Sequence, residues 1–215
     1  ATMKNLLLMA FAILTIGCGE QNPDGDKSTH VNQMRFVKGT FYLKNSDNPY
    51  TGKIIDSFKN GGKKIEFNIK NGKPHGLSTQ WYENGKMQAK VNNRDGKHDG
   101  LTERWYENGQ KAEEATYKEG KGNGLVLHWF ENGQKAEEST YKAGELDGPG
   151  VSWHENGQKE MEGKWKNGQQ EGLLTAWHEN GLKQMEAMFK EGELISEKYW
   201  NSKGEEVDSL EEAEQ

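Results

Sequence analysis

The chain is short of the residues that usually build and lock a globular core. Only 32% of its 215 residues are hydrophobic, its mean hydropathy is -1.06, and it contains 4 prolines and one cysteine, Cys18. A single thiol excludes an internal disulfide and a four-cysteine zinc site. Low apolar content can indicate disorder, but many of the 27 glycines and 7 tryptophans recur at fixed intervals. The composition therefore favours short strands joined by frequent turns.

The chain also lacks an excess of positive charge. Its net charge is -6, and the segment from Glu205 to the C-terminus carries six acids and no Lys or Arg, so these acids account for the whole net charge. A neutral body of mixed sign excludes nucleic-acid binding through a basic field. We expect residues 208–215 to be a solvated, disordered acidic tail.

The one long apolar run lies near the N-terminus. Lys4 precedes it, residues 6–16 are apolar apart from Thr15, and Gly17 and Cys18 follow. The run is too short to span a bilayer as a stable helix, and it fits the core of a secretory signal. Residues 1–18 resemble a bacterial lipoprotein signal peptide, in which Cys18 becomes lipidated, although Thr15 stands where such signals prefer Leu. An ordinary cleaved signal and a plain apolar N-terminus remain alternatives.

Two short segments separate this signal from the main part of the chain. Residues 19–33 are polar and are predicted to be a flexible tether. Residues 34–51 contain two short apolar runs and the turn signal Asn48-Pro49, so we expect N-terminal cap strands there. A lipidated chain of this kind is expected outside the cytoplasm, anchored to the outer membrane where the cell has one.

One motif recurs every 24 residues through the rest of the chain. Trp81-Tyr82-Glu83-Asn84-Gly85 has counterparts that begin at Trp105, Trp129, Trp153 and Trp177, and glycines recur with the same period from Gly52 to Gly172. Such a fixed period indicates a repeat protein. We expect six 24-residue repeats over residues 52–195, followed by a C-terminal capping half-repeat over 196–207.

Each repeat is predicted to be one β-hairpin, because an Asn-Gly turn signal joins two strand-like segments. In the repeat that starts at Gly100, a two-residue loop would pair Trp105 with Ala112 and separate the Trp from Tyr117. A three-residue loop with Gly109 left-handed would pair Trp105 with Lys111 instead. We favour the three-residue loop, because it is expected to place the large apolar side chains on one face.

The motifs resemble those of the MORN-repeat proteins, in the bacterial variant that repeats Trp-Tyr-Glu-Asn-Gly and Lys-x-Gly turns. The resemblance covers residues 35–207 and implies an all-β fold: an elongated single-layer antiparallel β-meander of stacked 24-residue hairpin repeats. Members of this variant are often labelled antitoxins of a toxin–antitoxin pair. The export signal departs from what a cytoplasmic antitoxin would carry.

No combination of residues predicts catalysis. The six histidines do not form a metal cluster, since only His154 and His178 share a repeat position, and two strands separate them by roughly 9.6 Å. The glycine-rich segment 120–124 lacks the strand-to-helix setting of a phosphate loop. We therefore expect no enzyme activity, no metal and no cofactor.

Two rows of side chains are the candidate binding residues. In the favoured register, the aromatic and histidine row lies on the face opposite the Trp row, together with a row of acids. The aromatic row is Tyr82, Tyr106, Phe130, His154 and His178, and the acidic row is Glu114, Glu138, Glu162 and Glu186. Such a surface suits a protein or peptide partner of basic character, although a merely solvated sheet face and an exposed Trp groove are alternatives. The predicted function is a membrane-anchored, non-catalytic repeat scaffold that binds a protein or cell-envelope partner, the alternative being an antitoxin that neutralises a partner toxin.

Overall fold

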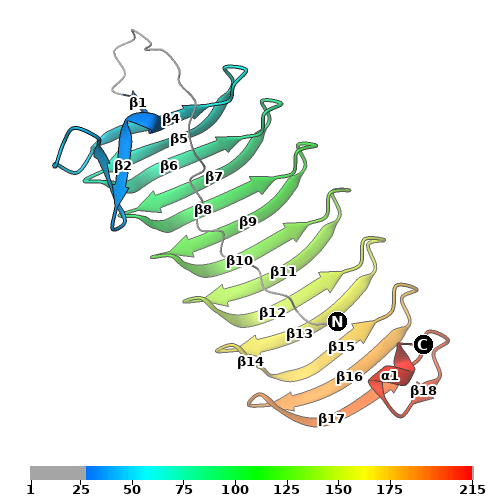
Figure 1. The fold of residues 1–215 in the computed structure, drawn as a ribbon. Helices are drawn as coiled ribbons and strands as arrows, with labels where there is room; N and C mark the ends of the chain where they lie inside the picture. Colours follow the sequence, from blue (N-terminus) through cyan, green and yellow to red (C-terminus); the bar gives the residue numbers. More distant parts are fainter. Residues whose placement is uncertain (1–27, 215) are drawn as a thin grey trace.

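The protein is dominated by one long, open, single-layer β-sheet (Figure 1). The computed structural model describes residues 28–214, and within them the main sheet contains sixteen strands. Consecutive strands of the repeat array are antiparallel neighbours from β4 to β18, except that β13 continues the sheet by pairing with β15, with β14 off this path. The structure confirms the predicted all-β meander of stacked hairpins. Residues 1–27, which hold the predicted signal, Cys18 and most of the tether, lie outside the described residues.

Each repeat contributes two strands of the array. Their bounds are β4 (Gly52–Ser57), β5 (Lys63–Lys70), β6 (Lys73–Trp81), β7 (Met87–Arg94), β8 (Lys97–Trp105), β9 (Lys111–Lys118), β10 (Lys121–Trp129), β11 (Lys135–Lys142), β12 (Glu145–Trp153), β13 (Lys159–Lys166), β14 (Gln169–Gln170), β15 (Gly172–Trp177), β16 (Lys183–Lys190), β17 (Glu193–Trp200) and β18 (Glu206–Val207). The short strand β14 pairs only with β13, just before the chain enters β15.

The predicted three-residue hairpin loop is confirmed. Tyr106 pairs with Gln110, the backbone N–H of Gly109 donates to the carbonyl oxygen of Tyr106 at 2.8 Å, and Gly109 has a φ of +95°. The side-chain oxygen of Asn108 accepts from the N–H of Gln110, also at 2.8 Å. Asn and Gly therefore have separate tasks in the loop, since the amide holds the turn and the glycine adopts the left-handed conformation.

The expected grouping of side chains on one face is wrong. Trp105 does pair with Lys111, but the next pair is Arg104 with Glu113, so Ala112 is an extra residue in a bulge. Beyond this bulge the ladder runs in the register of the rejected two-residue loop, with Leu101 opposite Thr116 and therefore on the Trp105 side of the sheet. A one-residue shift exchanges the faces, and Ala115 and Tyr117 consequently lie opposite the Trp row.

The return turns between repeats are also tight. Lys118 pairs with Lys121, and the two residues between them, Glu119 and Gly120, have φ values of +52° and +84°. Two consecutive positive φ values define a type I′ turn, whose twist matches that of the strands. The same non-glycine position has positive φ in the other return turns, at Asn71, Asp95, Ala143, Asn167 and Glu191, and Lys38 has it in the turn that precedes the array.

The periodic glycine marks a second irregularity in each repeat, just after the return turn. Gly148 has a φ of +140°, and a Cβ added there would lie 2.9 Å from the Cβ of Thr140. At the equivalent point of the last strand, Ser196 replaces the glycine and the ladder shifts by one residue only. This smaller shift explains why the terminal unit reaches Trp200 with one residue fewer than the others.

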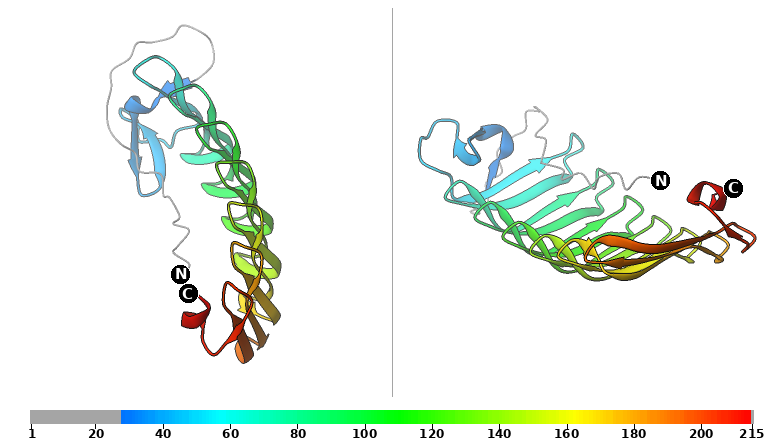
Figure 2. Two further views of the ribbon diagram at one scale, coloured as in Figure 1. Left: turned by 90° about the vertical axis from the view of Figure 1, so that its right-hand side faces the viewer. Right: turned by 90° about the horizontal axis from the view of Figure 1, so that it is seen from below.

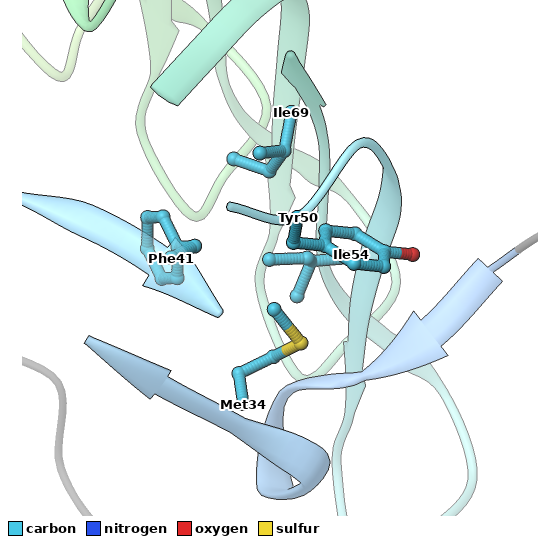
Figure 3. Packing of buried hydrophobic residues seen from close by; sticks show 5 residues of the cluster. All are labelled: Met34, Phe41, Tyr50, Ile54 and Ile69. Carbon is cyan, nitrogen blue, oxygen red and sulfur yellow. The ribbon is translucent and has the colours of Figure 1, made fainter. Parts of the chain in front are cut away.

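A cluster of buried hydrophobic residues joins the N-terminal segment to the first repeat (Figure 3). Strands β2 (Met34–Val37) and β3 (Thr40–Leu43) form a separate hairpin, and Met34 and Phe41 pack with Tyr50, Ile54 and Ile69. Ile54 is fully buried. These contacts cover the apolar end of the array, which otherwise would be open to water.

The ends of the described chain are more ordered than expected. Strand β1 (Ser28–His30) pairs in parallel with β4, and a 3₁₀ turn, η1 (Val31–Gln33), follows, so this part of the predicted tether belongs to the cap. In the predicted disordered tail, residues Leu210–Ala213 form helix α1, capped by Ser209 and Glu212, with Ala213 fully buried. No helix within residues 28–214 is long and apolar enough to cross a membrane.

The sheet is curved, and both capping elements lie on its concave side (Figure 2). Phe41 of the cap contacts Phe67 of β5, with ring centroids 5.6 Å apart. Phe67 occupies the same repeat position as Ala115, so this face is the one that carries Ala115 and Tyr117. We call this side the inner face and the side that carries the Trp row the outer face.

Candidate binding surfaces

The predicted aromatic and histidine row connects successive repeats along the hairpin tips. The hydroxyl of Tyr82 donates to the carbonyl oxygen of Trp105 at 2.8 Å, and Tyr106 makes the same bond to Trp129 at 2.7 Å. His154 Nε2 lies 2.9 Å from the carbonyl oxygen of Trp177. Burial raises the pKa of both Tyr hydroxyls, with a further contribution from nearby Glu side chains.

Histidine replaces tyrosine in this row without losing the bond. His178 Nε2 lies 2.9 Å from the carbonyl oxygen of Trp200, as His154 does with Trp177. Because a carbonyl oxygen only accepts, Nε2 must carry the proton in both residues. Phe130 is the exception, since its ring has no polar atom to offer to Trp153. The Tyr hydroxyls and His nitrogens of this row therefore bond to the backbone of the next repeat and stabilise the array.

An amide ladder reinforces the same edge. Asn108 Nδ2 donates to the backbone oxygen of Glu131 at 2.8 Å, and Asn156 Nδ2 donates to that of Glu179 at 2.6 Å. Equivalent hydrogen bonds to the next hairpin tip are donated by Asn60, Asn84, Asn132 and Asn180. The Asn of the motif therefore holds its own turn and the turn of the next repeat.

The predicted acidic row lies on the outer face, away from the position expected for it. Glu114, Glu138, Glu162 and Glu186 each form an ion pair with the Lys three residues before them, at 2.5–2.6 Å. The error follows from the bulge at Ala112, which reverses the face of every residue beyond it. The two rows chosen from the sequence therefore do not form one surface.

The outer face is a ladder of lysine and tryptophan contacts. Lys111 Nζ lies 5.7 Å from the ring centroid of Trp129 in the next repeat, and the same contact recurs from Lys63 to Lys183. In the second repeat Met87 stands at the Lys position, and Lys90, three residues later, covers Trp105 at 5.9 Å instead. Apart from Lys90, each of these cations is held by a ring and by a carboxylate, so most of the charge of this ladder is compensated within it.

A row of exposed leucines runs beside this ladder. Leu77, Leu101, Leu125 and Leu173 are 41–49% exposed on the outer face, and Pro149 takes the fourth position in the row. Since two strands separate successive members, each leucine stands about 10 Å from the next. Isolated exposed leucines at this spacing do not make a contiguous patch.

The middle of the inner face carries charge. Arg104 pairs with Glu113 at 3.0 Å, and His128 on the next strand lies 3.8 Å from Glu137. The hydroxyl of Ser139 also donates to Glu137. Burial raises the pKa of Tyr117 in this region, and the neighbouring Glu113 raises it further.

The inner face becomes uncharged towards the C-terminus. At the paired positions from β12 to β16, the register directs glycine, apolar, aromatic, Ser and Gln side chains inwards, and no charged ones. These include Met161, Trp165, Leu174, Met185 and Phe189. This change within one face was not recognised from the sequence, although the register, once known, is sufficient to find it.

The indole of Trp165 packs closely against this part of the sheet because two glycines make room for it. A Cβ added to Gly150 would lie 2.8 Å from Cζ3 of Trp165, and one added to Gly163 would lie 3.1 Å from Cη2. Neighbouring repeats combine the smaller Tyr117 and Tyr141 with Ala115 and Ser139. An open depression beside the indole is lined by Asp147, Gly148, Lys164, Trp165, Lys166 and Glu171.

No arrangement suited to metal binding is found in the part of the chain that the structure describes. Residues 28–214 contain no group of three His, Cys, Asp or Glu side chains that could hold a metal ion. The outer-face carboxylates are ion-paired, and the histidines of the tip row bond to backbone oxygens. The geometry of the described residues supports recognition by surface contact.

The repeat geometry agrees with a comparison with known protein families. Four consecutive segments, residues 74–92, 99–119, 123–143 and 146–167, match the family model described as MORN repeat variant. The protein is thus a repeat protein whose array contains MORN-variant repeats. No curated protein matches the chain.

Proposed function

We propose that the protein is a non-catalytic binding scaffold that holds a protein or cell-envelope component against its sheet. The observation that carries this proposal is the single layer. Over the middle and C-terminal repeats, neither face of the described sheet is covered by a second layer (Figures 1 and 2). A stack of similar turns and ladders gives a long, continuous surface, whose partner-facing residues vary from repeat to repeat.

The proposed setting is the outer side of a bacterial membrane, with a lipid anchor on Cys18. The support is the sequence of residues 1–18, where an apolar run follows Lys4 and ends at the only cysteine. Labelling cells with a fatty-acid analogue should mark the wild-type chain, and the substitution Cys18→Ala should abolish the label. Equal labelling of both chains would contradict the anchor.

Photo-cross-linking in cells tests the scaffold itself. A photoreactive residue placed at Met185 on the inner face, Met188 on the outer face, or Glu131 at a hairpin tip samples the three surfaces of the array. A scaffold should give a discrete cross-linked product from at least one of these positions. Absence of any product from all three, with the protein folded and exported, would contradict a binding function.

A second candidate is an antitoxin that neutralises a toxin by direct binding. It rests on the resemblance of the repeats to the bacterial MORN variant, whose members often carry that label. Expression of each neighbouring reading frame alone and together with this chain provides the test. A neighbour that arrests growth and is rescued by this chain would favour the antitoxin, and a lack of toxicity or of rescue would count against it.

A further inference from the structure

We infer that the C-terminal half of the inner face, between β12 and α1, is the docking site for a basic, amphipathic segment of a protein partner. The inference rests on the proposed binding function and names its surface and partner chemistry. It starts from the contrast between two parts of one face. Arg104, Glu113, His128 and Glu137 occupy the inner face from β8 to β11, whereas no charged residue holds an inward position of the ladder from β12 to β16. Asp147 and Glu171 stand outside the ladder, at the rim of the depression beside Trp165.

The floor of this surface has the composition of an interface core. Two methionines, Met161 and Met185, lie among Trp165, Leu174 and Phe189 on adjacent strands. Aromatic residues and methionine are enriched where proteins bind one another, and methionine adapts to partners of different shape. Gly150 and Gly163 allow the indole of Trp165 to pack closely against the sheet.

The C-terminal end of the surface supplies the charge that selects the partner. Helix α1 stands on the concave side next to β17 and β18 (Figure 2). The segment from Glu205 to Glu214 carries six acids, and in the described part of the chain only Glu206 has a cationic partner, Lys198 at 3.0 Å. An apolar floor that ends at unpaired carboxylates is complementary to an apolar segment that carries Lys or Arg.

The opposite side of the same strands does not offer this combination. Lys159 and Lys183 on the outer face each pair with a carboxylate and each cover a tryptophan ring. Their charges are therefore already compensated within the array. Met188, 40% exposed on the outer side of β16, gives a matched control for Met185, which points inwards from the same strand.

The test uses two fluorescent peptides and four variants of the full chain. One peptide is an amphipathic helix of Leu and Lys, and the other has Glu in place of every Lys. The Leu–Lys peptide should bind saturably and the Leu–Glu peptide should not. Met185→Glu should weaken binding about tenfold, as expected for a buried anchor position, and Met188→Glu should leave it within about twofold.

The contribution of the C-terminal carboxylates is tested separately from that of the apolar side chains. The double substitution Glu211→Lys with Glu214→Lys should weaken binding of the Leu–Lys peptide and make it less sensitive to salt, since both residues belong to α1 or its C-cap, next to β17 and β18. Glu179→Lys changes the same kind of charge at a hairpin tip and serves as the control. It should have little effect.

A photoreactive group on the Leu–Lys peptide provides a measurement that does not depend on variant stability. The cross-link should map to β13, β15 or β16 on the inner face.

Four results would each overturn the inference: equal loss of binding by Met185→Glu and Met188→Glu, equal binding of the two peptides, cross-links confined to the outer face, or no binding at all. So would self-association of the chain that Met185→Glu abolishes, because a second copy would then be the occupant. The scaffold function would survive these results if cross-linking in cells still gave a partner from another surface.

Discussion

The hydroxyl of Tyr106 donates a 2.7 Å hydrogen bond to the carbonyl oxygen of Trp129, 23 residues further along the chain. The bond joins one repeat to the next at the hairpin tip. Removal of the hydroxyl by Tyr106→Phe should lower the free energy of unfolding by about 0.5–1 kcal/mol, the usual net value of such a bond. Urea-induced unfolding followed by circular dichroism measures it, and an unchanged midpoint would contradict the role assigned to the bond.

Phe130 offers the reverse experiment in the same protein. Its ring occupies the tyrosine position without a hydroxyl, so the equivalent bond to Trp153 is absent. Phe130→Tyr should restore it and raise the free energy of unfolding by about 0.5–1 kcal/mol. A loss of stability would show that the space beyond the ring does not resemble that around Tyr106.

The return turns contain a second site for stabilisation. Ala143 has a φ of +53°, which costs an L-residue with an ordinary side chain roughly 1 kcal/mol, whereas asparagine tolerates this conformation. Ala143→Asn should therefore raise the free energy of unfolding. Asn167 occupies the same turn position in the next repeat with a φ of +51°, and Asn167→Ala should lower it. Shifts of the same sign in both variants would contradict the argument.

Gly163 and Trp165 are expected to be energetically coupled. A Cβ on Gly163 would lie 2.8 Å from Cδ1 of Leu174 and 3.1 Å from Cη2 of Trp165. Gly163→Ala should therefore destabilise the protein by about 1–3 kcal/mol through overpacking. The second substitution, Trp165→Tyr, reproduces the Ala-with-Tyr combination of an earlier repeat and should recover part of the loss. A double-mutant cycle measures the coupling, and simple additivity would refute it.

The hydroxyl of Tyr199 should lose its proton at a higher pH than an ordinary tyrosine. Its hydroxyl donates to Glu197 at 2.5 Å, and this bond, with some burial, raises the pKa to about 12. Because the folded-state pKa lies above the value of 10.0 for a free side chain, the contribution to stability is complete below pH 10.0 and is lost as the pH rises towards about 12. A pH titration followed by tyrosine absorbance should show one group that ionises at this higher pH. Glu197→Gln should return the pKa of Tyr199 to the ordinary range.

The period, the strand content and the loop type could all be predicted from the sequence. Asn108-Gly109 and a Trp every 24 residues are local signals, and the turn forms from residues adjacent in the chain. The faces could not be assigned, because the bulge at Ala112 depends on how Arg104 and Glu113 pair across strands. One such residue in each hairpin is enough to reverse the assignment of a whole surface.

The C-terminal segment shows a different limit of prediction from sequence. The helix at Leu210–Ala213 is signalled by Ser209 followed three residues later by Glu212, but the density of negative charge favoured disorder. Packing of Ala213 against its surroundings decides the outcome, and packing is not visible in a composition. The uncharged half of the inner face was missed for the same reason as the outer-face acids, since both follow from the register.

The ladders that tie one repeat to the next have a mechanical consequence. The strands of the array are stacked in sequence order, so the backbone hydrogen bonds between them point along the length of the sheet. Tension between the two ends of the array would load these bonds one row at a time. The strands would then separate one after another, starting at the weaker end of the sheet. The side-chain bonds of the hairpin tips, such as Tyr106 to Trp129 and Asn108 to Glu131, lie at one margin of the sheet, where they add resistance. Sideways load would instead stress many bonds together, which makes the array compliant along its axis and stiff across it.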